Sequence, residues 1–372
     1  MLASWRVGGL PPEGRKRSVL LCQCGEPDAE FKHAQDADGT KFGSGLIVFL
    51  GKLWTVGRLK LAAEVDMRLI TDSELAGLIN MRDAVEAVRI AFEQFAESGG
   101  AMLGRGRAVA EVQSRPVMLS ALGAVLPAAG VMGAKVYSTV GGRFNFMVVL
   151  FSAQTGDTLA VVEGNQLTRL RTAAATAVAA ERLAAPGSRV LAVFGAGVQA
   201  RAHAEALLLA RPFAEVLVSA RSGAPEFADW IGTEFGVAAR AVDAEVAARQ
   251  AQVIVTATRA TEAVFDGAWI QPGAFVAAVG SSKPHARELD DALLARADLI
   301  AVEWREAVLA EAGEFVRAAP GVIDPERVVE LGRLLVSGAD YQRQAHDIVV
   351  YKSVGVGLED LALAHLAWQR AS

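Results

Sequence analysis

The sequence predicts an α/β protein in which a parallel sheet, covered by helices on both faces, follows a mixed region of strands and helices. Three observations support this. Short apolar runs alternate with helical patterns over residues 189–302. A glycine-rich turn separates the first of these runs from a helical segment. Strand-like runs dominate the earlier residues 105–162. Buried strands that alternate with helices are typical of parallel α/β sheets.

Length and composition limit the classes of partner. The chain has 372 residues, is 52% hydrophobic and carries a formal net charge of -5, so two domains with a large core are possible. No basic stripe is interleaved with aromatic residues, which argues against nucleic acid as a partner. No apolar run reaches the length of a membrane span, and no basic segment leads directly into an apolar one as in a signal peptide.

Residues 1–66 differ from the rest of the sequence because no helical or strand period persists there. We expect an N-terminal extension, such as a misassigned start codon would produce; the alternative is a genuine but irregular arm. Cys22 and Cys24 lie in this segment, and one Cys-x-Cys pair completes neither a zinc site nor a disulfide framework. The absence of other cysteines fits a cytoplasmic protein. The five histidines lack a metal-binding spacing, so no metal is expected.

The first region is expected to combine two helices, a mixed sheet and a long helix. Thr71 and Glu74 have the spacing of a capping box, and apolar residues at helical spacing over 85–95 give a second helix, which Gly99 and Gly100 end. Strands are expected at residues 133–140, 146–152 and 158–162. An alanine-rich helix over about 167–184 is stopped by Pro186-Gly187.

The second region predicts alternating strands and helices. The expected strands span residues 189–194, 215–220, 252–257, 274–280 and 299–302. The first is followed by a helix to about Ala210. The last segment, residues 354–369, has an amphipathic helical pattern, and we expect it to return to the first region.

A phosphate-binding turn is predicted at Gly-Ala-Gly-Val-Gln-Ala, residues 195–200, because it follows an apolar strand and opens a helix. Gly195 permits the tight turn, Gly197 lets a diphosphate approach the backbone, and Ala200 allows close helix–strand packing. The free N–H groups at the helix start, including Val198 and Gln199, then face the phosphates. We therefore predict a Rossmann-type domain for a nicotinamide dinucleotide. The alternative is a tight turn with a purely structural role.

The end of the second strand selects between NAD and NADP. An acidic residue there would bind the ribose hydroxyls of NAD, but this chain has Arg221-Ser222. A guanidinium and a hydroxyl can bind a 2′-phosphate, so NADP(H) is favoured over NAD(H). The alternative is that Arg221 is a solvated surface charge. Thr256 and Thr258, at the end of the strand 252–257, complete the expected cofactor contacts.

Several motifs occur together in a characteristic order. They are Gly-Ala-Lys-Val-Tyr at 133–137, Leu-Phe-Ser-Ala-Gln-Thr-Gly at 150–156, Leu-Thr-Arg-Leu-Arg-Thr-Ala-Ala at 167–174, the glycine turn, and Tyr-Lys-Ser-Val-Gly-Val-Gly-Leu-Glu-Asp-Leu at 351–361. From about Met67 to the end, the chain resembles the ornithine cyclodeaminase/mu-crystallin family, which includes ornithine cyclodeaminases, alanine dehydrogenases and ketimine reductases.

The resemblance implies a homodimer of two-domain chains that pass hydride between nicotinamide and the α-carbon of an amino or imino acid. Residues 67–185 and 328–372 would form the mixed α+β substrate-binding and dimerisation domain. Residues 186–327 would form the Rossmann-type domain, and residues 1–66 would lie outside the family.

The resemblance also implies the site. Lys135 matches the family's substrate-carboxylate lysine and Arg171 its arginine in Thr-x-x-Arg-Thr, so both are expected to be catalytic and substrate-binding; a planar guanidinium can hold a carboxylate with two bonds. The alternative for each is a surface charge. Arg105 or Arg107 would join them, unless that strand face is solvated. Thr168 and Thr172 are expected at a cofactor phosphate, with Thr168 alternatively a helix N-cap.

Ser282 departs from the family pattern. It stands where ornithine cyclodeaminases carry an aspartate, and a neutral hydroxyl cannot act as a general base as a carboxylate can. The segment still places Ser282 among the expected substrate contacts. His285 would be an acid near the nicotinamide or, alternatively, a solvent-facing loop residue. His203 is expected at the surface or in packing. Lys135 would supply the proton if burial lowers its pKa.

The sequence therefore predicts an NADP(H)-dependent reductase of α-imino acids. The substrate would be a cyclic ketimine such as pyrroline-2-carboxylate or piperideine-2-carboxylate, or the imine of a keto acid and ammonia. Two alternatives remain open. One is an ammonia-lyase of the ornithine cyclodeaminase type with a recycled cofactor, and the other is an NADPH-dependent small-ligand binding protein like mu-crystallin.

Overall fold

The computed structural model describes residues 49–50, 53–54, 67–336 and 341–372. The chain separates into two compact units, Met1–Val65 and Asp66–Ser372. Within the first unit, strands β1 (Phe49–Leu50) and β2 (Leu53–Trp54) pair antiparallel. Cys22 and Cys24 lie outside the described residues. In the described part of the chain, no helix combines the length and apolar character needed to cross a membrane.

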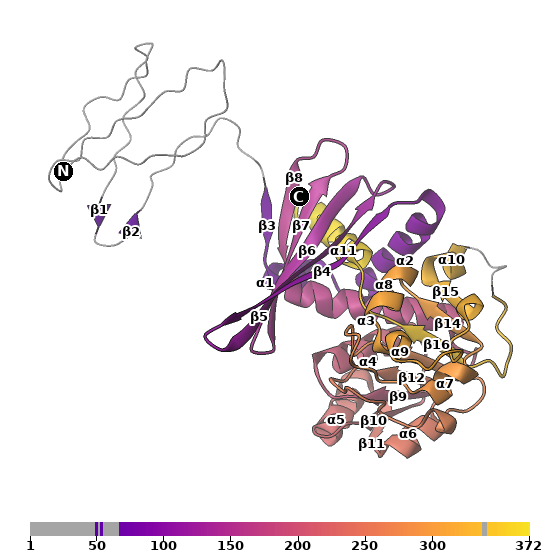
Figure 1. The fold of residues 1–372 in the computed structure, drawn as a ribbon. Helices are drawn as coiled ribbons and strands as arrows, with labels where there is room; N and C mark the ends of the chain where they lie inside the picture. The colour runs from indigo at the N-terminus through magenta and orange to yellow at the C-terminus, as the bar shows by residue number, and fades with distance from the viewer. Residues whose placement is uncertain (1–48, 51–52, 55–66, 337–340) are drawn as a thin grey trace, which may run out of the picture. The chain divides into compact units, whose positions relative to one another are not determined.

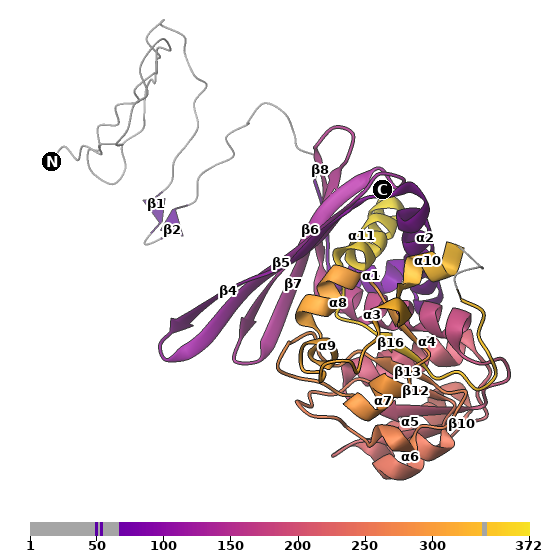
Figure 2. The ribbon, with the colours of Figure 1, turned by 45° about the vertical axis from the view of Figure 1, so that its right-hand side comes forward.

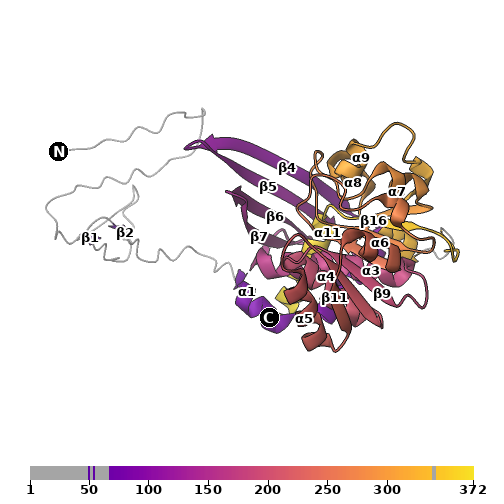
Figure 3. The same cartoon turned by 90° about the horizontal axis from the view of Figure 1, so that it is seen from below.

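The second unit begins with a six-stranded mixed sheet, as the sequence predicts. Its strand order is β3 (Arg68–Ile70), β8 (Thr158–Glu163), β7 (Arg143–Ser152), β6 (Val131–Val140), β5 (Arg115–Leu126) and β4 (Ala101–Val112). Only the β3–β8 pair is parallel. Figures 2 and 3 show the hairpins β4–β5 and β6–β7 reaching beyond the helices. Their far ends are mostly exposed.

Helices α1 (Asp72–Leu78) and α2 (Met81–Ser98) follow β3, and their ends explain the sequence pattern. Thr71 is the N-cap of α1 and accepts a hydrogen bond from the Glu74 N–H. The predicted capping box is only half formed, because the Glu74 carboxylate pairs with Arg68 instead. The reciprocal cap belongs to α2, between Asn80 and Asp83. Gly99, at φ +72°, ends α2 as predicted.

The alanine-rich helix α3 (Gly164–Leu183) lies between the two sheets of the unit (Figure 1). Nearly all of its residues after Leu170 are buried, and about half of them are alanine. Small side chains allow neighbouring helices to approach on every face, so α3 packs against α2, α4 and α11. The helix begins three residues before the expected Leu167. Thr168 therefore lies inside the helix, and its alternative role as an N-cap is wrong.

The second sheet has eight strands, all parallel, which confirms the Rossmann-type prediction. Their order is β11 (Ala238–Ala241), β10 (Glu215–Ser219), β9 (Val190–Phe194), β12 (Val253–Thr256), β13 (Phe275–Ala278), β16 (Val349–Lys352), β14 (Leu299–Val302) and β15 (Val328–Glu330). The central strands are buried along their whole length. Continuous apolar strands of this kind need helices on both faces.

The helices of this region connect the parallel strands. They are α4 (Val198–Ala210), α5 (Ala224–Phe235), α6 (Ala244–Gln250), α7 (Asp291–Arg296), α8 (Arg305–Glu311), α9 (Gly313–Val316) and α10 (Leu331–Val336). Two short 3₁₀ turns, Gly267–Trp269 and Pro325–Arg327, complete the connections.

Strands β4, β5, β11, β15 and β16 have no counterpart among the expected strand ranges, and β16 changes the topology of the parallel sheet. It lies between β13 and β14 in the sheet, although it is the last strand along the chain. Helix α11 (Gly357–Ala371) then crosses to the other sheet and packs against β5 and β6, as predicted for the C-terminal helix. It begins three residues later than expected because Gly355 adopts φ +77°. The expected domain boundary at residue 328 does not follow sheet membership, since β15 and β16 belong to the parallel sheet.

Candidate active site

The turn between β9 and α4 has the geometry that a diphosphate requires. Gly195 adopts φ +111°, and a Cβ there would lie 2.7 Å from the Ala257 carbonyl oxygen. A Cβ on Gly197 would meet only open space. Gly197 is the N-cap of α4 and supplies no side chain, so no side-chain cap takes up the N–H groups of the first turn. Val198 is 67% exposed. The turn therefore leaves a backbone donor set free for an anion.

The loop after β10 lies against this turn. A Cβ on Gly223 would come 3.7 Å from the Cβ of Ala196 in the glycine turn. Arg221 and Ser222 precede Gly223 and are exposed. Neither side chain has a hydrogen-bond or ion-pair partner among the described residues. The structure thus brings the two predicted selectors of the 2′-phosphate next to the predicted diphosphate site.

Helices α3 and α4 each contribute one further polar group where they meet. The Thr168 Oγ1 and Gln199 Oε1 atoms are buried and have no hydrogen-bond partner in the described part of the chain. The Gln199 amide lies 3.4 Å from the Thr168 carbonyl oxygen. Buried polar atoms without partners are costly, so these two oxygens fit a bound polar ligand. The Thr172 hydroxyl, in contrast, donates to the Thr168 carbonyl oxygen at 2.7 Å.

Three cations from three different elements converge beside this region. Lys135 lies on β6, Arg171 on α3 and Arg105 on β4, and their side chains are only 2%, 7% and 6% exposed. Burial excludes the alternative that Lys135 and Arg171 are surface charges. Two consecutive residues of α11 hold them in place. Asp360 accepts a hydrogen bond from Lys135 Nζ at 2.7 Å and lies 3.1 Å from Arg171 Nε, while Glu359 accepts from Arg171 Nη1 at 2.5 Å.

The cluster shifts the protonation of its members. Burial, and then the neighbouring Arg171, lower the pKa of Lys135 from 10.5 to about 8, although Asp360 opposes the shift. Burial, and then Glu303, raise the pKa of Glu359 well above its usual range. Asp360 is the one of the two carboxyl groups that contacts both cations, at 2.7 Å from Lys135 Nζ and 3.1 Å from Arg171 Nε. Carboxylates therefore accompany the buried cations, and Glu311 likewise lies 3.4 Å from Arg105 Nη1. The guanidinium and ammonium groups remain the members of the cluster that can bind an anionic ligand.

The structure distinguishes the two arginines of β4. Arg105 donates from Nη1 to Ser282 Oγ at 2.8 Å and from Nη2 to the carbonyl oxygens of Val354 and Gly355, both at 2.7 Å. Arg107 is more exposed and donates to the Ser282 carbonyl oxygen at 3.0 Å. The Arg171 guanidinium also rests on Gly355, where a Cβ would lie 2.7 Å from its Nη1. Arg105 is thus the residue that reaches the cluster.

The threonines at the end of β12 make a contact that the sequence did not predict. The hydroxyls of Thr256 and Thr258 donate to the buried Glu288, at 2.8 and 2.7 Å. Both hydroxyl protons are thus donated to Glu288. The predicted role of the two threonines as cofactor contacts stays a prediction. His285 is exposed, which favours its solvent-facing alternative. His203 is fully buried in α4, and burial lowers its pKa to about 4, so it is a neutral packing residue.

Sequence reasoning also missed the acidic half of the site. Glu359 and Asp360 appear in the quoted motif, but no role was predicted for them. Glu303 accepts hydrogen bonds from Ser353 Oγ and from the N–H groups of Val354 and Gly355. The available signal was two adjacent carboxylates inside an otherwise apolar helix start, a place where charges are rarely left unpaired.

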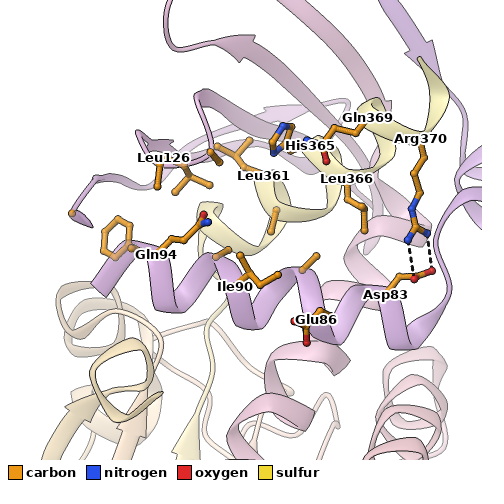
Figure 4. Close-up of a pocket in the computed structure, with 17 residues that line it drawn as sticks. Asp83, Glu86, Ile90, Gln94, Leu126, Leu361, His365, Leu366, Gln369 and Arg370 are labelled. Atoms are coloured by element: carbon orange, nitrogen blue, oxygen red, sulfur yellow. Dashed lines mark hydrogen bonds and ion pairs between the residues drawn. The ribbon is translucent and has the colours of Figure 1, made fainter. Parts of the chain in front are cut away.

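A groove of about 480 Å³ lies elsewhere, between α2 and α11 (Figure 4). Ile90 of α2 and Leu361 of α11 line it from its two sides, and the Asp83–Arg370 ion pair lies at one end. None of the predicted site residues lines it. The groove is therefore separate from the cation cluster. Within the described residues, no group of acidic residues, histidines and cysteines could hold a metal ion.

Known proteins share both the sequence and the fold. The family model "Ornithine cyclodeaminase/mu-crystallin family" matches residues 65–372. Ketimine reductase mu-crystallin of Mus musculus is 40% identical over 225 residues, which covers 59% of this chain and 68% of the relative.

Two solved structures cover more of the chain. A probable ornithine cyclodeaminase from Bordetella pertussis Tohama I is 46% identical with a TM-score of 0.78, covering 82% of this chain and 97% of that one. The Δ(1)-pyrroline-2-carboxylate reductase of Thermococcus litoralis, in complex with NADH and L-proline, is 29% identical with a TM-score of 0.76, and the two coverages are again 82% and 97%. The chain, from residue 65 to its last residue, belongs to the ornithine cyclodeaminase/mu-crystallin family.

Proposed function

We propose that this protein is an NADP(H)-dependent reductase of α-imino acids, with cyclic ketimines such as pyrroline-2-carboxylate as the leading substrate class. The observation that carries the proposal is the convergence of Arg105, Lys135 and Arg171 beside the Ser282 loop at the end of β13. In open parallel sheets, ligands bind outside the carboxyl ends of the strands. A relative that is named a ketimine reductase and a structural neighbour that binds NADH and L-proline support the same reaction.

The residues divide the chemical tasks among them. Arg105 and Arg171 bind the substrate carboxylate, since both guanidinium groups are buried and point into one cluster. Lys135 donates a proton to the imine nitrogen, and Asp360 holds its ammonium group in place. The reduced nicotinamide dinucleotide supplies a hydride to the imine carbon when it is bound. The imine thus gains one proton and one hydride and becomes a secondary or primary amine.

Ser282 separates this proposal from an ammonia-lyase. Its hydroxyl accepts a hydrogen bond from Arg105 at 2.8 Å, so it extends the carboxylate-binding side of the site. It offers no carboxylate to bind a substrate ammonium or to accept its proton. The likeness to a probable ornithine cyclodeaminase keeps the lyase as the rival to test.

Stoichiometry tests the proposal directly. NADPH and NADH absorbance is followed against pyrroline-2-carboxylate, piperideine-2-carboxylate, pyruvate with ammonia, and ornithine. We expect one NADPH to be consumed for each imine reduced. Ammonia release from ornithine without net consumption of cofactor would establish the lyase. Tight binding of NADPH without turnover of any imine would favour a binding protein.

Arg221 carries the proposed preference for NADP(H). A charge-assisted hydrogen bond to phosphate contributes about 1.5–3 kcal/mol, so Arg221→Ala should raise the KM for NADPH by roughly 10- to 100-fold. The KM for NADH should stay nearly constant, because NADH lacks the 2′-phosphate. Arg240→Ala is the matched control, since Arg240 lies on the neighbouring strand β11 and pairs with Glu215. Equal effects on both cofactors would contradict the assignment.

We further propose a homodimer formed through the protruding hairpins. Their exposed apolar side chains are Leu103, Val109, Val112, Leu119, Val125, Val140 and Phe144. Apolar surface of this extent on two adjacent hairpins is typical of a protein interface. Light scattering should give twice the 39.1 kDa mass of one chain, and a monomer at micromolar concentration would contradict the proposal.

A further inference from the structure

Glu288 is a buried carboxylate that the proposed reaction does not use. It is 0% exposed, and no arginine, lysine or histidine among the described residues forms an ion pair with it. Four donors satisfy it instead. Its Oε1 accepts from the Thr258 N–H and the Thr258 hydroxyl, both at 2.7 Å. Its Oε2 accepts from the Thr256 hydroxyl at 2.8 Å and the Gly280 N–H at 2.7 Å. A buried charge without a cation is costly, so this arrangement needs an explanation.

All four donors lie at the carboxyl ends of two adjacent parallel strands. Thr256 ends β12, Thr258 follows it, and Gly280 follows β13. Gly280 leaves room for the carboxylate, because a Cβ there would lie 2.4 Å from Glu288 Oε1. Glu288 therefore fixes the distance between the ends of β12 and β13. This is the edge of the sheet at which an open α/β fold binds its ligand.

Each of the two strand ends touches one half of the proposed site. On one side, the Thr258 Cγ2 atom comes 3.6 Å from the position of a Cβ on Gly195, in the diphosphate turn. On the other side, Gly280 leads directly to Ser282, whose hydroxyl contacts Arg105. Glu288 thus connects the cofactor half with the substrate half.

A second set of contacts anchors Glu288 itself. Its N–H donates to Glu314 Oε1 at 2.8 Å, and Glu314 Oε2 lies 3.0 Å from Lys352 Nζ. Lys352 also donates to the Ser281 carbonyl oxygen at 3.0 Å. Glu288, Glu314 and Lys352 are all at most 1% exposed. The segment that carries Ser282 is consequently tied at both ends by groups that have no contact with solvent.

From this geometry we propose that Glu288 is a positioning residue for hydride transfer. It fixes the position of the end of β12 relative to the segment that carries Ser282. The end of β12 lies next to the cofactor turn, and the Ser282 segment lies next to the substrate cations. The inference rests on the proposed function. A misplacement of the reacting groups by about 1 Å is enough to slow a reaction by roughly 100-fold, so a fixed distance between these two strand ends has direct kinetic value.

The test is Glu288→Gln. Each carboxylate oxygen accepts a hydrogen bond from one backbone N–H. In either orientation of the glutamine amide, its NH₂ group would therefore face a backbone N–H, and a backbone N–H cannot act as an acceptor. We expect kcat to fall roughly 10- to 100-fold while the Kd of NADPH changes by less than about threefold. The primary deuterium isotope effect on kcat should rise, because hydride transfer becomes slower than product release. The fluorescence of bound NADPH, which reports the surroundings of the nicotinamide ring, should also change.

Asp290→Asn is the matched control. Each oxygen of Asp290 also accepts a backbone N–H, from Gly267 at 2.8 Å and Leu293 at 2.9 Å, but neither donor lies at the ends of β12 or β13. This variant should lose thermal stability without a change in isotope effect or NADPH fluorescence. If E288Q is recovered poorly, Thr256→Val replaces it in the test. Thr256→Val removes one donor to Glu288 and keeps the side-chain shape, so it should show the changes expected of E288Q in weaker form.

The outcomes separate the two proposals. If the wild-type protein fails to oxidise NADPH with any of the imines, the proposed function fails. The NADPH fluorescence of E288Q then still tests whether Glu288 positions the nicotinamide ring. If wild-type protein turns over but E288Q keeps its kcat, isotope effect and fluorescence while losing only stability, as Asp290→Asn is expected to do, then Glu288 has a purely structural role and the inference is overturned.

Discussion

Lys135→Met should lower kcat/KM for pyrroline-2-carboxylate by about 10³-fold. The substitution removes both the proton donor and one of the cations available to the substrate carboxylate, while methionine keeps most of the buried volume. In the wild type, the rate of imine reduction should fall as the pH rises through about 8, because the pKa of Lys135 is lowered to that value and only its protonated form can donate. The methionine variant should lose this limb of the profile.

Binding of NADPH serves as the control for Lys135→Met. Lys135 lies on β6, whereas the diphosphate turn lies between β9 and α4. The Kd of NADPH, followed by fluorescence, should therefore stay within about threefold of the wild type. A variant that retains turnover within about tenfold would show that another group, or water, protonates the imine.

Asp360→Asn should move the same pH limb in a defined direction. The negative charge of Asp360 and its hydrogen bond raise the pKa of Lys135 and partly offset its burial. Without that charge, the pKa of Lys135 falls further, so the loss of activity with rising pH should begin at a lower pH than in the wild type. Removal of one partner from a buried ion pair also destabilises the fold by about 3 kcal/mol. The measurements are the pH profile of kcat/KM and urea unfolding.

Asp83→Asn gives the matched control at another ion pair that involves α11. Asp83 pairs with Arg370 of α11, but both side chains are partly exposed, and exposed pairs contribute about 0–1 kcal/mol. This variant should leave the pH profile unchanged and stability nearly so. If Asp360→Asn also leaves the limb in place, then Asp360 does not set the protonation of Lys135.

The elements with a local signature could be predicted from the sequence. The glycine turn was identified because strand, turn and helix follow one another directly. The alanine-rich helix α3 and the strand β14 are likewise predictable, because the alanine-rich pattern and the apolar run each lie within one continuous segment of the sequence. Lys135 and Arg171 came from the family resemblance, and the structure shows that both are buried in one cluster.

The remaining features depend on contacts between distant parts of the chain. Glu359 and Asp360 stand in the first turn of α11, where acidic residues are ordinary because they favour the helix N-terminus. Their pairing with Lys135 and Arg171 spans about half of the sequence, so two adjacent carboxylates in the sequence do not reveal which cations they contact. Glu288 is hidden in the same way. Strand β16 is only four residues long, and a short apolar run does not reveal whether it is a strand or part of the following helix.

The late position of β16 also has a consequence for biosynthesis. This strand lies inside the parallel sheet, between β13 and β14, yet it leaves the ribosome after all the other strands. During translation, β13 and β14 are made without the neighbour that joins them, so the backbone groups facing the gap must stay open until almost the whole protein has been synthesised. Premature termination before residue 349 would therefore yield a chain with an exposed central seam, a substrate for chaperones and proteases rather than a shorter enzyme.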